Sequence, residues 1–165
     1  MRALDGLGIG SHLAELPGGG ESLTDIADVR LEDWHAAIRG YAPGLTASFR
    51  GGALLDTAAR IGAWRFAPEI GERILRDLKR AALASADTTL LAGHNLSADF
   101  LRELEAATPG AHARLRTVRL DSDPAHAEAR VPGSPLWRRA EPGEDPALAA
   151  ALAVDLAQWA RACAA

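Results

Sequence analysis

The stretch from residue 88 to residue 120 constrains the fold most, because an apolar run, a capped helix and a second apolar run follow one another there. The run Thr88 to Ala92 has the β-branched and apolar content of a buried strand, and Arg114 to Leu120 predicts the next strand. Between them, Ser97 is placed to cap a helix. The apolar positions of that helix are Phe100, Leu101 and Leu104. Because a connection that contains a helix joins parallel strands with a right-handed crossover, the sequence predicts a β-α-β unit.

Two further helices have strong local signals. Pro68 suits the first turn of a helix and is followed by Glu69, which predicts a helix from there to about Leu83. Near the end of the chain, Asp145 is placed as a cap and Pro146 as the first helical residue, which predicts a closing helix. The expected buried stripe of this helix is Leu148, Leu152, Leu156, Trp159 and Cys163.

The remaining segments have weaker signals. Ser22 and Asp25 form a capping pattern that predicts a helix reaching about Ile38, either continuous or broken near Val29. The proline-rich, polar stretch 121–146 is expected to be a long connection. Short strands are expected at Arg2 to Leu4, Ser11 to Leu16 and Leu136 to Ala140, and a short helix at Leu54 to Ile61.

Length and composition favour one folded domain. With 165 residues, of which 48% are hydrophobic and 24% charged, the chain is long enough to bury a core. No repeat or low-complexity linker divides it. The expected fold is therefore a single α/β domain over residues 1–165, with a short, at least partly parallel sheet in a Rossmann-like three-layer arrangement, packed helices and a C-terminal amphipathic helix.

The charge and the cysteine content limit the classes of binding partner and the cellular compartment that we expect. The formal net charge of -4 provides no general attraction for nucleic acid or for an anionic membrane surface. Cys163 is the single cysteine, so no intramolecular disulfide forms. Because the first twenty residues lack the apolar segment of a signal peptide and no later run approaches about 18 apolar residues, we expect a cytoplasmic protein without a membrane span.

The ends of the two strands predicted first form the candidate site. In open α/β sheets, ligands bind beyond the carboxyl ends of the strands. Parallel strands would bring His94 near Asp121 or Asp123, where a carboxylate can orient the imidazole for proton transfer or for metal binding. These three are the candidate catalytic residues of a small-molecule-binding domain or metabolic enzyme. The candidate ligand-binding residues are Gly93, Asn95, Ser97 and His126.

The same residues have a purely structural interpretation, in which Asn95 occupies a turn, Ser97 caps a helix and residues 121–124 form a polar turn. A second hypothesis is a non-catalytic interaction module that meets a protein partner, with Trp137 as the best anchor. No Walker loop, Gly-x-Ser-x-Gly elbow or His-Glu-x-x-His helix is present, so the sequence assigns no cofactor or metal. Late in the chain, the arginines that could meet a phosphate or an acidic partner are Arg114, Arg116, Arg119, Arg130, Arg138 and Arg139.

A third hypothesis comes from the segment "HNLSAD", residues 94–99, which resembles the second acidic motif of DEDD-type 3′-5′ exonucleases. This resemblance implies a ribonuclease H-like fold and a degenerate nuclease site in which Asp5, Asp99 and Asp155 converge. The chain departs from the family at the first motif, because Gly6 and Leu7 follow Asp5 where the family has a second carboxylate. Two-metal chemistry depends on that carboxylate.

Overall fold

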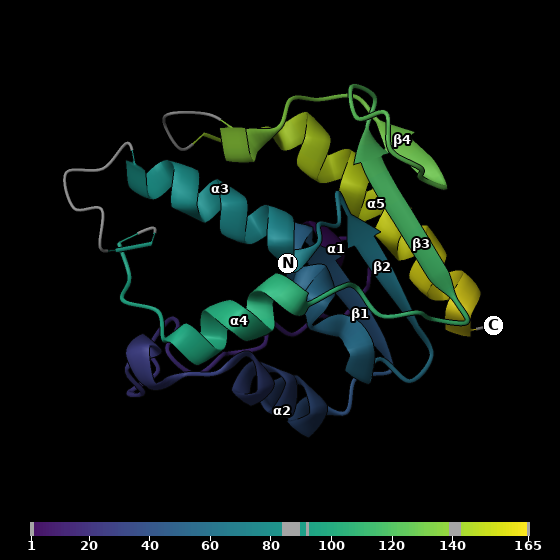
Figure 1. Ribbon diagram of the computed structural model, residues 1–165. Helices are drawn as coiled ribbons and strands as arrows, with labels where there is room; N and C mark the ends of the chain where they lie inside the picture. Colours follow the sequence, from purple (N-terminus) through teal and green to yellow (C-terminus); the bar gives the residue numbers. More distant parts are fainter. Residues whose placement is uncertain (1, 84–89, 92, 139–142, 165) are drawn as a thin grey trace.

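The computed structural model describes residues 2–83, 90, 91, 93–138 and 143–164, and its centre is one parallel sheet (Figure 1). The sheet has four strands in the order β1-β2-β3-β4, and each neighbouring pair is parallel. This confirms the predicted α/β class. The strands are β1 (Leu45–Phe49), β2 (Gly62–Phe66), β3 (Leu115–Leu120) and β4 (Ala129–Val131).

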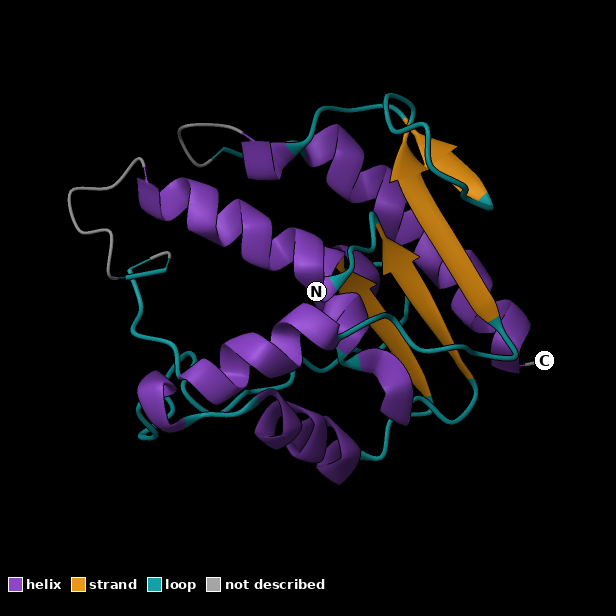
Figure 2. Cartoon of the chain, viewed as in Figure 1, coloured by secondary structure: helices purple, strands orange, loops and turns teal. Residues whose placement is uncertain are grey.

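Helices cover both faces of the sheet (Figure 2). The helices are α1 (Arg2–Asp5), α2 (Leu31–Tyr41), α3 (Gly71–Leu83), α4 (Ala98–Ala106) and α5 (Pro146–Ala164). Four 3-10 turns are η1 (Ile26–Asp28), η2 (Arg50–Leu54), η3 (Asp56–Ala58) and η4 (Leu136–Arg138). Because the strands lie in the sheet in chain order, right-handed crossovers place their connections on one face. The other face is left for the terminal helices α1 and α5.

Each face has its own apolar core. Side chains alternate along a strand, so Trp64 and Phe66 of β2 point to the face on which α5 packs. The helices α2, α3 and α4 enclose the second core, which includes Leu75 and Phe100. The two cores place the sheet in the middle of three layers.

Arg65, between Trp64 and Phe66, points to the face opposite α5 and is buried there. Its residue exposure is 5%, and that of its partner Asp56 is 2%. The Arg65 guanidinium donates to both carboxylate oxygens of Asp56, at 2.6 and 2.8 Å, and His112 Nε2 lies 3.1 Å from the same carboxylate. This buried ion pair connects β2 to the turn that follows β1.

The closing helix α5 has the predicted start, and of the predicted stripe Leu148, Leu152 and Leu156 are buried while Trp159 and Cys163 are half-buried. Asp145 Oδ1 accepts the backbone N–H of Leu148 at 3.0 Å, and Leu152 and Leu156 are buried against the sheet. By length and composition, α5 is a described helix that could cross a membrane. In the structure, its residues Leu148, Leu152 and Leu156 pack in the apolar core on one face of the sheet.

Asp155 attaches α5 to the sheet and makes stability depend on pH. Burial opposes ionisation of this carboxyl, but hydrogen bonds from Arg116 (2.8 Å) and Trp64 (2.7 Å) outweigh it and lower its pKa. Because the pKa of Asp155 is lower in the folded protein than in the unfolded chain, its ionised carboxylate stabilises the fold at any pH above the pKa of the unfolded chain. This stabilisation is lost as the pH falls to the pKa of the folded protein.

We therefore expect Asp155→Asn to reduce the free energy of unfolding at pH 7 by about 1.5–3 kcal/mol, the range for hydrogen bonds to charged groups. The difference from the wild type should shrink below about pH 4, where the unfolded-state carboxyl is protonated. Urea denaturation of the wild type and of the variant at pH 7 and at pH 3 measures this difference in the free energy of unfolding. A difference of equal size at both pH values would contradict the assignment.

Several sequence predictions need correction. The segment Arg2 to Leu4 lies in α1, residues 11–16 form no strand, and Leu136 to Arg138 form the turn η4 rather than a strand. The helix expected from Leu54 to Ile61 is replaced by two 3-10 turns, because the connection between the parallel strands β1 and β2 is short. The long helix after Ser22 is broken near Val29, as one of the two alternatives had it.

The strand expected at Thr88 to Ala92 falls largely outside the described residues. Of that run only Leu90 and Leu91 are described, and Leu91 makes an isolated bridge to His94 rather than joining the sheet. The parallel partner before β3 is instead β2, and the connection between β2 and β3 holds both α3 and α4. The β-α-β principle holds, with a longer crossover than expected.

Candidate functional site

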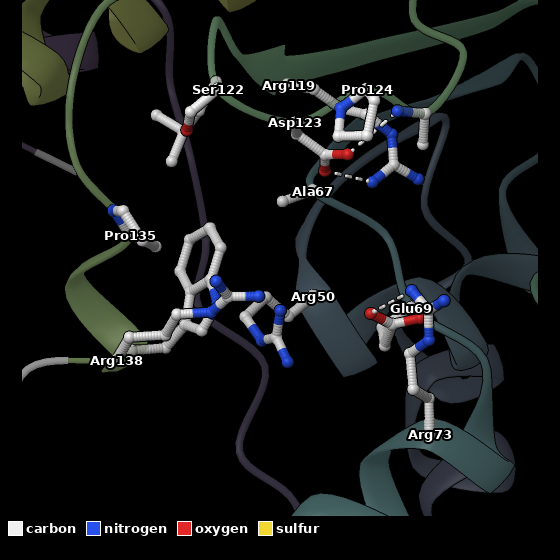
Figure 3. Close-up of a pocket in the computed structure, with 13 residues that line it drawn as sticks. Arg50, Ala67, Glu69, Arg73, Arg119, Ser122, Asp123, Pro124, Pro135 and Arg138 are labelled. Carbon is white, nitrogen blue, oxygen red and sulfur yellow. Dashed lines mark hydrogen bonds and ion pairs between the residues drawn. The ribbon is translucent and has the colours of Figure 1, made fainter.

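A cavity of about 470 Å³ lies at the carboxyl edge of the sheet (Figure 3). Arg50 follows β1 directly and Ala67 follows β2 directly, while Leu120 ends β3. Parallel strands present their carboxyl ends at one edge, so these positions meet although they lie far apart in the chain. The other lining residues are Glu69, Arg73, Arg119, Ser122, Asp123, Pro124, Ala125, Pro135, Trp137 and Arg138.

The backbone at this edge is held in an uncommon conformation. Arg50 has φ 47° and Ala67 has φ 46°. Residues other than glycine rarely adopt such left-handed angles, and they occur preferentially where a binding site is built. Both strained residues line the cavity, each at the first position after a strand. The strain thus lies where the chain turns sharply out of the sheet to form the walls.

Arg119 and Asp123 form a fixed pair within the lining. The Arg119 guanidinium donates to Asp123 Oδ2 at 2.6 Å, to the Pro68 carbonyl at 3.2 Å and to the His126 carbonyl at 3.1 Å. Burial raises the pKa of Asp123, but the Ala125 N–H and the charge of Arg119 outweigh it, so the pKa lies below its ordinary value. Asp123 is therefore a carboxylate at neutral pH and accepts hydrogen bonds only.

Three other arginines are held loosely. An Arg50 nitrogen lies 3.5 Å from a carboxylate oxygen of Asp77, and an Arg73 nitrogen lies 3.4 Å from Glu69. Arg138 makes no ion pair with any residue that the structure describes. These three come from η2, α3 and η4, so three separate elements direct guanidinium groups at one cavity.

Trp137 positions one of these arginines. The guanidinium carbon of Arg50 lies 4.6 Å from the centre of the Trp137 ring, within the range of a cation–π contact. Phe66 of β2 meets the same indole edge-on, with ring centres 5.9 Å apart. The sheet thus supports the indole, and the indole holds Arg50 at the cavity without using its N–H donors.

The predicted site residues are divided between two cavities. Asp123 lines the carboxyl-edge cavity, and Asp121 is exposed beside it. His94 lines a separate apolar groove of about 420 Å³ among α2, α3 and α4. His126 has a side chain that is 86% exposed, and its Nδ1 lies 4.0 Å from Glu128. The structure therefore does not place His94 with Asp123 at the carboxyl-edge cavity.

The turn before α4 has local structural partners. Gly93 has φ 82°, a left-handed angle that suits glycine, between two backbone hydrogen bonds that join Leu91 and His94. Ser97 Oγ accepts the backbone N–H of Phe100 at 3.0 Å, as a helix cap does. Asn95 is exposed next to this turn. These contacts correspond to the structural interpretation of the segment.

The acidic residues of the exonuclease resemblance have separate partners. Asp99 pairs with Arg102 within α4 at 2.7 Å, and Asp155 is bound by Arg116 and Trp64. Asp5 lies in α1. Within the described part of the chain, no three metal-ligating side chains gather at one point.

Sequence reasoning named some of the cavity residues and missed others. Arg138 and Trp137 stood out in the sequence, whereas Arg50, Glu69 and Arg73 did not. The available signal was local: in "FRGG" and in "FAPE" an aromatic residue is followed within three positions by a charged residue and by glycine or proline. Comparison of the chain with protein families, with curated proteins and with solved structures found no match.

Proposed function

We propose that this protein binds a small anionic molecule in the carboxyl-edge cavity. The observation that carries the proposal is the convergence of Arg50, Arg73 and Arg138, which make only long ion pairs or none with the carboxylates that the structure describes. Guanidinium groups bind carboxylate and phosphate oxygens in pairs of hydrogen bonds. The overall charge of -4 makes this local excess of positive charge a feature of the site rather than of the composition.

The lining favours binding over chemistry on the ligand. Asp123 is held as a carboxylate of lowered pKa by Arg119 and Ala125, so it is a weak proton acceptor and has no proton to give. The rest of the charged lining consists of arginines and Glu69, whose Oε1 accepts the backbone N–H of Ile70 at 3.2 Å. The role we propose is therefore that of a small-molecule-binding domain, in the cytoplasm, where a chain without an intramolecular disulfide is stable.

Replacing the loosely held arginines tests the proposal. We expect Arg138→Gln and Arg50→Gln each to weaken the binding of inorganic phosphate or of a dicarboxylate such as malate by about ten- to a hundredfold, because each removes charged hydrogen bonds to the anion. Isothermal titration calorimetry at low ionic strength measures the dissociation constants.

The matched control is Arg39→Gln. Arg39 pairs with Glu32 on the exposed side of α2 and does not line the cavity. This variant should bind each anion as the wild type does. Absence of binding to either anion, or an equal loss in the Arg39 variant, would overturn the proposal.

A further inference from the structure

We propose that the ligand is a phosphate monoester of a polyhydroxylated compound, a sugar or polyol phosphate. This inference rests on the proposed anion site and specifies its ligand. Three features of the cavity support it: the balance of charge, the size, and the kinds of groups on the wall opposite the loosely held arginines.

The charge of the lining matches a dianion. Four arginines line the cavity together with the carboxylates of Glu69 and Asp123, which leaves a net charge of two positive units. A phosphate monoester carries about 1.5 to 2 negative charges at pH 7, whereas a single carboxylate carries one. A phosphate monoester therefore neutralises this site with a single group, whereas carboxylate ligands need two separate carboxylates to do so.

The size of the cavity requires more than a phosphate group. At about 470 Å³ it falls within the range of roughly 300–1,000 Å³ that small-molecule sites occupy. A water molecule takes up about 30 Å³, so a bare phosphate would leave most of the cavity to solvent. The ligand therefore has an organic part that occupies the space beyond the anion.

The wall away from the loosely held arginines suits hydroxyl groups. Figure 3 shows Ser122, Asp123 and Pro124 across the opening from Arg50 and Arg138. Asp123 uses Oδ2 for Arg119 and Oδ1 for the Ala125 N–H, and each carboxylate oxygen has two lone pairs, so both oxygens can accept a ligand hydroxyl. Ser122 is exposed at the cavity and can both donate and accept.

The apolar lining between these polar groups is thin. Ala67, Pro124 and Pro135 offer small hydrocarbon surfaces, and Arg50 covers one face of the Trp137 indole. Such surfaces suit the C–H groups of a hydroxylated carbon chain or ring. They provide no deep apolar slot for a hydrocarbon tail, and the covered indole is less open to stacking by an aromatic base.

Calorimetric titration of the full chain with five compounds tests the inference: inorganic phosphate, glucose 6-phosphate, glucose, glucuronate and AMP. We expect glucose 6-phosphate to bind at least tenfold more tightly than phosphate and than glucuronate, which has a similar ring but one carboxylate charge. Glucose should not bind measurably, and AMP should bind more weakly than the hexose phosphate.

Two variants locate the hydroxyl contacts. Ser122→Ala should weaken glucose 6-phosphate binding about three- to tenfold and leave phosphate binding unchanged, while Arg138→Gln should weaken both. Ser11→Ala, in an exposed N-terminal segment, is the matched control and should change neither.

The outcomes separate this inference from the proposed function. If none of the anions binds, the proposed function fails and the inference fails with it. If the anions bind but glucuronate or AMP equals or exceeds glucose 6-phosphate, or if the ester binds no better than phosphate, the sugar phosphate inference alone is overturned.

Discussion

Replacing Asp56 by alanine is expected to reduce the free energy of unfolding by about 3–5 kcal/mol, because the change leaves the buried Arg65 guanidinium without its counter-charge. Both side chains are almost fully enclosed, with exposed fractions of 1% for Asp56 and 6% for Arg65. Domains of ordinary stability have only about 5–15 kcal/mol in total, so this single change removes much of the margin. Urea denaturation followed by circular dichroism measures it.

Two comparisons make this expectation specific. Asp99→Asn removes a carboxylate from an exposed pair with Arg102 and should cost much less, because solvent screens surface ion pairs. The double variant with Asp56→Ala and Arg65→Met should be more stable than Asp56→Ala alone, because no buried charge remains uncompensated. If Asp56→Ala is no more harmful than Asp99→Asn, the buried pair does not have the role assigned to it.

Gly71→Ala is expected to be comparably harmful for a steric reason. A Cβ atom at Gly71 would lie 1.6 Å from the backbone oxygen of Leu104, so α3 and α4 would have to move apart. Overpacking of a core costs about 1–3 kcal/mol and occasionally more, and a backbone atom cannot move aside as a flexible side chain can. We therefore expect a loss above about 3 kcal/mol, measured as the unfolding free energy in urea.

Gly40→Ala is the matched control for this glycine. Gly40 lies within α2, and a Cβ atom there would meet nothing within 4 Å. Alanine at an open helical position is favoured over glycine by about 0.5–1 kcal/mol, so this variant should be as stable as the wild type or more stable. A similar loss in both glycine variants would contradict the close contact between α3 and α4.

The parts of the fold that could be predicted have signals within a few neighbouring residues. The cap at Asp145 with Pro146, the cap at Ser97 and the apolar run of β3 are examples. Each depends on contacts within one or two turns of chain, which composition and spacing report directly. Near Val29 the local signals were balanced, so the sequence allowed either a continuous or a broken helix and did not decide between them.

The strand β2 was missed because its sequence does not follow a strand pattern by itself, whereas the alternating letters "LTASF" of β1 did offer such a pattern. The letters of β2 are "GAWRF", which begin with glycine and contain a charged arginine. All five of its residues are buried because β1 and β3 flank it and helices cover both faces. Arg65 is tolerated there only because Asp56, nine residues earlier, is folded back against it.

The sequence could predict where the candidate site lies but not which residues form it. The rule that ligands bind beyond the carboxyl ends of parallel strands pointed to the right edge of the sheet, and Asp123 is at this edge. The sequence could not show that Arg50, Arg73 and Arg138 share a cavity. Their separations along the chain match no helical or strand period, and only the strand order brings them together.

The sequence by itself determined the α/β class, the parallel direction of the sheet, the β3 strand and the capped helices, because short-range hydrogen bonding and apolar periodicity decide these features. The tertiary structure alone decided the strand order, the burial of Arg65 with Asp56 and the gathering of arginines at the carboxyl edge. These features depend on desolvation and charge between residues that are distant in the chain. Such interactions exist only after the strands have paired.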